Sequence, residues 1–189
     1  MNPTKHPSAI RSQNEITHTL LQLMQVYTYH EITVKQIILE AHLARKTFYR
    51  NFQSKDDVLD SYITGIMHQY VQSLKQEADG QLTYILDIIF SFCVQNREFL
   101  LLLRGHHMLH ILLEKWNTFI PMIHDQVAKA DCTLFHSFSE KQVSYIIAFN
   151  VGAVWNIIMK WIEHGMKDSP ELIKETILNY LNRFDLSVS

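Results

Sequence analysis

Cationic and hydroxyl-bearing side chains gather in one short stretch within the first third of the chain. Arg45, Lys46 and Thr47 are followed by Tyr49 and Arg50, and no acidic residue interrupts them. Arginine and lysine bind phosphate oxygens, and an arginine can also donate two parallel hydrogen bonds to the edge of a guanine. This composition therefore predicts contact with a polyanion.

The aromatic residues of the same stretch indicate how it is held in place. Phe48 and Phe52 are four residues apart, so they lie on one side of a helix. If both rings are buried, the helix is a rigid rod whose other side can enter the major groove of duplex DNA. Its first three residues would face base edges, with Arg45 as the candidate reader of a guanine. Tyr49 and Arg50 would contact phosphates and fix the register.

Capping patterns and apolar spacing place this rod in a small helical unit. A first helix is marked by apolar residues at steps of three and four: Ile16, Leu20, Leu23 and Tyr27. Thr33 with Gln36 forms a capping-box pattern before a helix of about two turns, and Ser54 with Asp57 forms another cap before a long helix. Two short helices around a tight turn, followed by a long helix, predict a helix-turn-helix domain.

Two further residues stand at the starts of these helices, where free backbone N–H groups attract anions. Thr33 would supply a hydroxyl and Lys55 a cation beside the phosphates of a bound duplex. For Thr33, a plain cap role is compatible with this one. For Tyr49, the alternative is a half-buried packing role.

Charge and composition favour a polyanion-binding segment joined to a larger part with another role. Residues 1–55 carry seven basic and three acidic side chains, a net charge of +4, and the ten basic and sixteen acidic ones that follow give −6. With 47% hydrophobic residues but only five glycines and four prolines, the 189-residue chain is predicted to be all-α. Two cysteines without CxxC spacing, and no signal peptide, predict a reduced cytoplasmic setting.

The segment from Ile32 to Lys55 resembles the TetR family of bacterial transcriptional regulators. The shared features are the Thr-Val opening of the second helix, an Ile/Ala stripe, the T-F-Y-x-x-F core of the third helix, and the lysine just after the start of the fourth. The segment Trp161–Pro170 resembles, more loosely, a C-terminal domain common in regulators from Firmicutes. The resemblance implies a three-helix DNA-binding domain over residues 1–55, with the motif at about 33–52, and a helical effector-binding and dimerisation domain over residues 56–189.

Three positions depart from the family pattern. His42 stands in the turn where the family usually has glycine, and histidine tolerates a positive φ better than most other residues. Ala44 cannot cap the third helix, at a cost of about 1 kcal/mol relative to serine. Asn51 replaces the histidine that is common in the family, so one phosphate contact is expected to be weaker or differently aimed.

Residues 143–162 form a mostly apolar segment that is long enough to span a membrane. Asn150, Asn156 and Lys160 lie inside it, and its flanks show no lysine or arginine bias, so no membrane is predicted. A soluble helix that is apolar almost all round must be covered on both sides. We expect one side to face its own domain and the other a second subunit in a homodimer; the alternative is complete burial within one core.

The second part of the chain also holds the candidates for a ligand site. Its aromatic and sulfur-bearing residues would suit a flat hydrophobic effector, and the alternative, more common for aromatic residues at helical spacing, is that they simply fill the core: Phe90, Phe92, Met108, Trp116, Phe119, Tyr145 and Trp155. The resemblance implies that a ligand there alters the separation of the two DNA-reading helices.

A histidine group raises the alternative of metal sensing. His106 and His110 are one helical turn apart, as zinc ligands on a helix are, and His107 lies between them. Cys93, Glu114 or His124 could complete a site, and solvated histidines are the alternative. We predict no resident cofactor.

Known catalytic motifs are missing from the sequence, which has no P-loop, no G-x-S-x-G and no H-E-x-x-H. The sequence therefore predicts a dimeric regulator of transcription, a repressor that a small effector releases from a palindromic operator, and not an enzyme. Two alternatives stay open: a regulator on the same scaffold that depends on a protein partner, and a zinc-responsive regulator.

Overall fold

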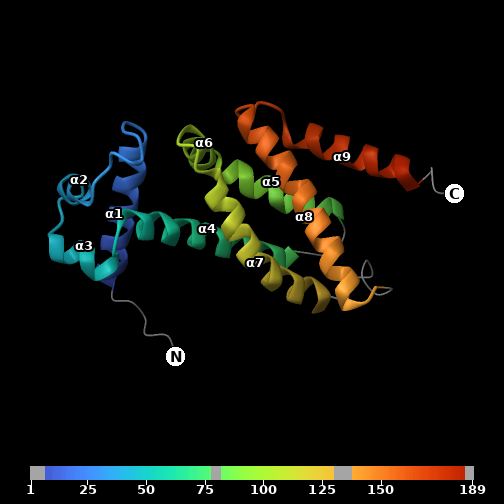
Figure 1. The fold of residues 1–189 in the computed structure, drawn as a ribbon, viewed down its shortest axis with the longest axis horizontal. Helices are drawn as coiled ribbons and strands as arrows, with labels where there is room; N and C mark the ends of the chain where they lie inside the picture. Colours follow the sequence, from blue (N-terminus) through green and yellow to red (C-terminus); the bar gives the residue numbers. More distant parts are fainter. Residues whose placement is uncertain (1–6, 78–81, 130–137, 186–189) are drawn as a thin grey trace. The chain divides into compact units, whose positions relative to one another are not determined.

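A computed structural model of the chain describes residues 7–77, 82–129 and 138–185, and all the regular secondary structure in these ranges is helical (Figure 1). In chain order the helices are α1 (Pro7–Met24), α2 (Val34–Glu40), α3 (Arg45–Asn51), α4 (Lys55–Glu77), α5 (Leu82–Gln95), α6 (Arg97–Gly105), α7 (Leu109–Lys129), α8 (Glu140–Glu163) and α9 (Pro170–Asp185). Two compact units, Met1–Ile66 and Met67–Ser189, meet within α4. The all-α prediction is confirmed.

The first unit is a small three-helix core in which α1 packs against α2 and α3 (Figure 1). Ile16 and Leu20 of α1 are completely buried, as are Ile37 of α2 and Phe48 of α3. The helical spacing of these apolar positions, read from the sequence, predicts this arrangement. The prediction that Tyr27 belongs to the buried face of this first helix is wrong, because α1 ends at Met24 and the Tyr27 side chain is 45% exposed.

The turn between α2 and α3 has the geometry that a glycine would normally supply. His42 has a φ of 51°, its N–H donates to the carbonyl of Leu39, and the N–H of Leu43 donates to that of Ile38. These two bonds form a Schellman motif, which satisfies the last carbonyls of α2. The prediction that a histidine would adopt a positive φ here is confirmed.

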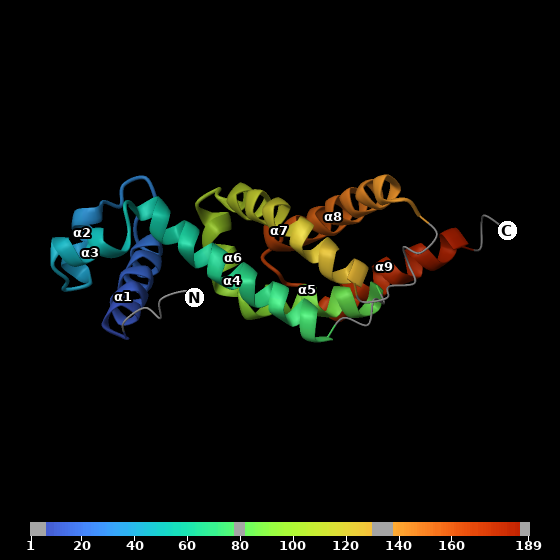
Figure 2. The same ribbon diagram turned by 90° about the horizontal axis from the view of Figure 1, so that it is seen from below.

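The second unit surrounds a core rich in aromatic residues. Helix α5 contacts α9 and α6, and α6 also contacts α7 and α8 (Figure 2). The ring of Tyr70 lies 5.2 Å from those of Phe92 and Trp116, measured between centroids. Pro121 would be expected to kink or divide a helix, but α7 runs through it as one helix.

One face of helix α8 is buried in this unit, and the opposite, bare face is exposed to solvent. Its N-cap, Ser139, forms a full capping box with Gln142. Ile158 and Ile162 are buried, whereas Tyr145 and Phe149 are 68% and 74% exposed. Complete burial of this helix in one core, the alternative to dimerisation, is therefore wrong. By length and composition alone the segment Lys141–Glu163 could cross a membrane, which for a single helix is weak evidence of a span, and 12% of its apolar stretch is buried in the chain.

Candidate nucleic-acid interface

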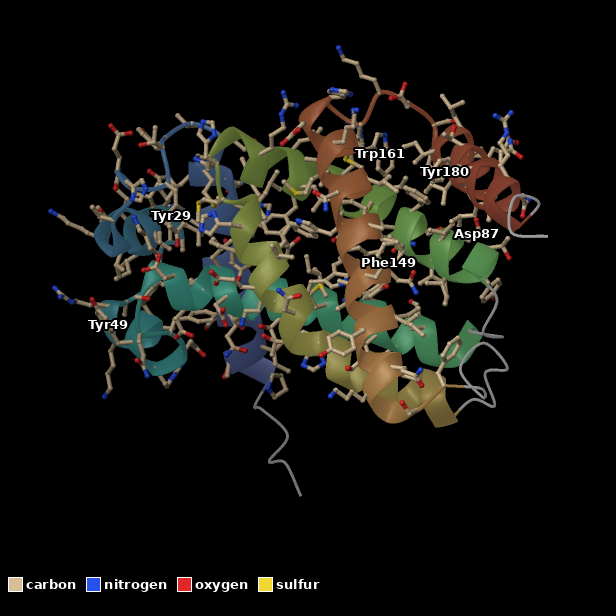
Figure 3. The ribbon with its side chains drawn as sticks, turned by 45° about the vertical axis from the view of Figure 1, so that its right-hand side comes forward. Tyr29, Tyr49, Asp87, Phe149, Trp161 and Tyr180 are labelled. Atoms are coloured by element: carbon tan, nitrogen blue, oxygen red, sulfur yellow. The ribbon has the colours of Figure 1, made fainter. Side chains whose placement is uncertain are left out.

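Helix α3 presents a cationic side to solvent. Arg45, Lys46 and Arg50 are exposed, and the side chain of Tyr49, labelled in Figure 3, is 48% exposed. The ring of Phe48 on the opposite side is completely buried and lies 6.2 Å from that of Phe52, which is 4% exposed. The helix is thus anchored by its two phenylalanines while its polar side remains accessible.

Two contacts order the polar side of α3. The guanidinium of Arg45 lies over the ring of Tyr49, 5.5 Å from its centroid, an arrangement that cation–π attraction favours. The side-chain amide of Asn51 donates to the carbonyl of Thr47 at 2.8 Å, and both side chains are partly buried. The Asn51 amide is therefore engaged with its own helix.

The starts of α2 and α3 differ in their caps. The Thr33 hydroxyl oxygen accepts a hydrogen bond from the Gln36 N–H, and the backbone N–H of Thr33 donates to the Gln36 side chain at 2.8 Å. The predicted capping box is confirmed. Ala44 at the start of α3 makes no side-chain cap bond, also as predicted.

Lys55, at the first turn of α4, is turned back onto the protein. Its ammonium donates to the carbonyls of Tyr29, His30 and Ile32. The predicted cap at Ser54 is present, since its hydroxyl accepts from the N–H of Asp57 at 3.1 Å. The structure thus brings Arg45, Lys46, Tyr49 and Arg50 onto one exposed side of α3, while Lys55 faces the loop between α1 and α2.

The predicted effector residues do not all lie together. Met108, Trp116 and Phe119 are buried, and the rings of Trp116 and Trp155 are 6.2 Å apart. Phe90 instead packs against Trp161, and Tyr145 is on the exposed face of α8.

Two surface hollows of the second unit have other linings. One, of about 480 Å³, lies between α5 and α9 and includes Phe90 and the Lys174–Asp87 ion pair. The other, of about 250 Å³, lies between α4 and α5 and includes Tyr70 and Phe92.

The histidine group has a structural explanation at one position. His107 follows the end of α6 with a φ of 57°, and its N–H donates to the carbonyl of Arg104. In the part of the chain that the structure describes, no group of three or more His, Cys, Asp or Glu residues could hold a metal ion. Cys93 is buried, which raises the pKa of its thiol to about 12 and so disfavours the thiolate that a metal requires. The side chain of His124 lies outside the described residues.

Comparison with known proteins decides the family. Residues 80–183 match the family described as "Transcriptional regulator C-terminal region", and residues 16–62 match "Bacterial regulatory proteins, tetR family". The chain belongs to the TetR family. This regulator of transcription is thus a DNA-binding protein and not an enzyme.

Relatives of this TetR-family chain are similar over nearly its whole length. The "HTH-type dhaKLM operon transcriptional activator DhaS" of Lactococcus lactis subsp. lactis (strain IL1403) is 26% identical over 178 residues, which cover 92% of this chain and 90% of DhaS. A solved structure described as "Dihydroxyacetone kinase operon activator DhaS" is 23% identical, with a TM-score of 0.59 over 92% of this chain and 96% of that one. The fatty acid degradation regulator FadR from Bacillus halodurans is 16% identical, with a TM-score of 0.63 over 92% and 94% of the two chains.

Sequence reasoning missed a pair of residues that joins the loop before α2 to the start of α4. Tyr29 is 5% exposed, and its hydroxyl donates to the carboxylate of Asp56 at 2.6 Å. Burial, followed by this hydrogen bond and the charge of Asp56, raises the pKa of Tyr29. No local spacing marks the pair, because the two residues are 27 positions apart.

Proposed function

We propose that this TetR-family regulator binds a palindromic operator as a homodimer and inserts one α3 helix into the major groove of each half-site. The observation that carries the proposal is the exposed cationic side of α3, opposite the completely buried Phe48. A helix whose apolar side is fixed in a core can present its polar side to base edges without losing its position.

Within α3 we assign the base-reading role to its amino-terminal residues. Arg45 is the candidate for a bidentate contact with guanine, and Lys46 and Thr47 lie beside it on the first turn. Tyr49 and Arg50 contact phosphates and so set the register of the protein on the duplex. Thr33 caps α2 and leaves its first turn available to a phosphate.

The second copy of the chain covers the bare face of α8. Tyr145 and Phe149 lie one turn apart on this face, and α9, the next helix along the chain, exposes Leu172 and Tyr180, at 55% and 60%. Exposed aromatic and aliphatic side chains on two long helices are typical of a surface that another protein covers. A second copy also explains how two α3 helices could read a two-fold symmetric site.

A small-molecule effector, bound within the helical second unit, completes the proposal. Its support is the group of buried or half-buried rings around Trp116, which lies 5.2 Å from Tyr70 and 6.2 Å from Trp155 between centroids and could line an apolar ligand site. A thermal-shift screen of metabolites tests this directly, since a ligand at 100 times its dissociation constant adds about 2.7 kcal/mol to the free energy of unfolding.

Footprinting on the region upstream of the protein's own gene tests the core of the proposal. We expect protection of two half-sites about 10 base pairs apart or a multiple of that, because each α3 reads one turn of the helix. Light scattering should give the mass of a dimer. A monomer in solution that protects no discrete site would contradict the proposal.

Activation, rather than repression, is the second candidate for the sign of regulation. The sequence predicts a repressor, whereas the DhaS relative from Lactococcus is described as a transcriptional activator. A reporter fused to the bound promoter separates the two, because deletion of a repressor raises expression and deletion of an activator lowers it. If the change requires another protein, co-elution of that protein with the regulator on DNA identifies the partner-dependent alternative. The protein is expected to act in the cytoplasm, where bacterial DNA is accessible.

A further inference from the structure

The ammonium group of Lys55 is fully occupied inside the first unit. Its nitrogen lies 2.5 Å from the carbonyl oxygen of Tyr29, 2.8 Å from that of Ile32 and 3.2 Å from that of His30. A lysine ammonium has three N–H donors, so these three carbonyls use all of them. A direct bond to a phosphate would require one of them to be given up.

The same loop is held by a second bond from the first turn of α4. The Tyr29 hydroxyl donates to Asp56, and the Lys55 ammonium lies 4.6 Å from the centroid of the Tyr29 ring. Tyr29 is thus fixed at its carbonyl, at its ring and at its hydroxyl, in each case by a residue at the start of α4.

This loop leads directly into the first turn of α2, the end that the proposed function places against a phosphate. The carbonyl of Ile32, which Lys55 holds, precedes Thr33, and Thr33 caps α2 and accepts the N–H of Ile37 on its own carbonyl. Earlier in the loop, the carboxylate of Glu31 accepts the N–H and the hydroxyl of Thr28. The position of the first turn of α2 therefore depends on the bonds that Lys55 makes.

We infer that Lys55 is a positioning residue, which together with Tyr29 and Asp56 clamps the loop before α2 so that the end of this helix fits the duplex, and that it binds no phosphate itself. The inference rests on the proposed DNA-binding function and assigns to Lys55 a role different from the phosphate contact that its place at a helix start predicts.

The two roles differ in how DNA affinity responds to salt. On duplex DNA, log affinity falls as log salt concentration rises, and each phosphate contact makes the slope of this fall steeper by about 0.9. We expect Lys55→Met to weaken binding about tenfold, through loss of charged hydrogen bonds, while leaving this slope unchanged. Arg50→Met, which removes an exposed cation of α3, should make the salt dependence shallower by about one unit of slope.

A third variant separates positioning from charge. Tyr29→Phe keeps the ring and the net charge but removes the bond to Asp56, and we expect weaker binding with an unchanged slope. The probe is a labelled duplex covering the region upstream of the protein's own gene. Circular dichroism at the assay temperature restricts the comparison to fully folded protein. If Lys55→Met does not fold, the Tyr29→Phe variant alone decides, because unchanged affinity in that variant overturns the inference.

Hydrogen exchange without DNA tests the clamp independently. The amide of Ile37, which closes the first turn of α2, should exchange at least about tenfold faster in Lys55→Met than in the parent protein, and the Leu20 amide in α1 should change less. If the parent binds no duplex, the proposed function fails, whatever the exchange shows. If the parent binds and Lys55→Met lowers the salt slope by about one unit, the inference alone fails.

Discussion

The exposed sides of α3 and α8 differ in how favourably water solvates them. The cations on α3 are well solvated, so this side is stable in solution without a partner. The rings of Tyr145 and Phe149 on α8 expose apolar surface to water, and burying apolar surface is worth about 25 cal/mol per Å². The α3 surface is therefore stable in water as it stands, whereas the α8 surface would gain free energy if another apolar surface covered it.

The two sides also differ in what anchors them. In α3 the opposite side is a pair of phenylalanines in the small core of the first unit, and the helix has only seven residues. In α8, a helix of 24 residues, the opposite side includes Ile158, Trp161 and Ile162 in the core of the second unit. The short helix therefore depends on packing for its position, whereas the long one has many more internal hydrogen bonds to maintain it.

The largest expected effect comes from placing a charge on the bare side of α8. Phe149→Glu should prevent pairing of two copies, because the carboxylate would be buried without a partner. Loss of the second DNA-reading helix should then weaken operator binding by about 10²–10⁴-fold. Light scattering and fluorescence anisotropy measure the two consequences.

Val26 provides the matched control for this substitution. It has the same 74% exposure as Phe149 but lies in the first unit, between α1 and α2. Val26→Glu should remain dimeric. A dimeric Phe149→Glu protein would show that α8 is not the interface.

A smaller effect is expected on the cationic side of α3. Arg45→Ala should cost about 1–3 kcal/mol of binding free energy and relax sequence preference at one position, because a bidentate contact to a base edge is lost. Binding to a panel of operator variants measures both changes. Arg11→Ala removes an equal charge from the exposed side of α1 and should leave the preference intact; equal behaviour of the two variants would remove Arg45 from the reading surface.

The smallest effect concerns the N-terminal caps of the two short helices α2 and α3. Ala44→Ser should raise the free energy of unfolding by about 1 kcal/mol, because the serine oxygen can accept the N–H of Thr47. Thr33→Ala should lower it by a similar amount, since it removes an existing capping box. Urea denaturation followed by circular dichroism measures both. A destabilised Ala44→Ser protein would mean that the serine cannot adopt the cap geometry.

Much of the fold follows from the sequence because its signals are local. The cap at Thr33, the paired phenylalanines of α3 and the positive φ of His42 each depend on residues within about four positions. The family resemblance over residues 32–55 rests on the same local patterns. The end of α1 was misjudged, since an aromatic residue in helical register cannot show by itself whether the helix continues to it.

Local residue patterns are enough to predict which segments are helical, which side of each short helix is buried and that α3 carries the cations. The bonds from Lys55 to the loop before α2 and the exposure of Tyr145 and Phe149 follow instead from how the chain folds. The carbonyls that Lys55 bonds lie 23 to 26 positions away along the chain, and the exposure of α8 depends on how the second unit packs around it. Contacts over such distances depend on packing, and no short pattern of residues records them.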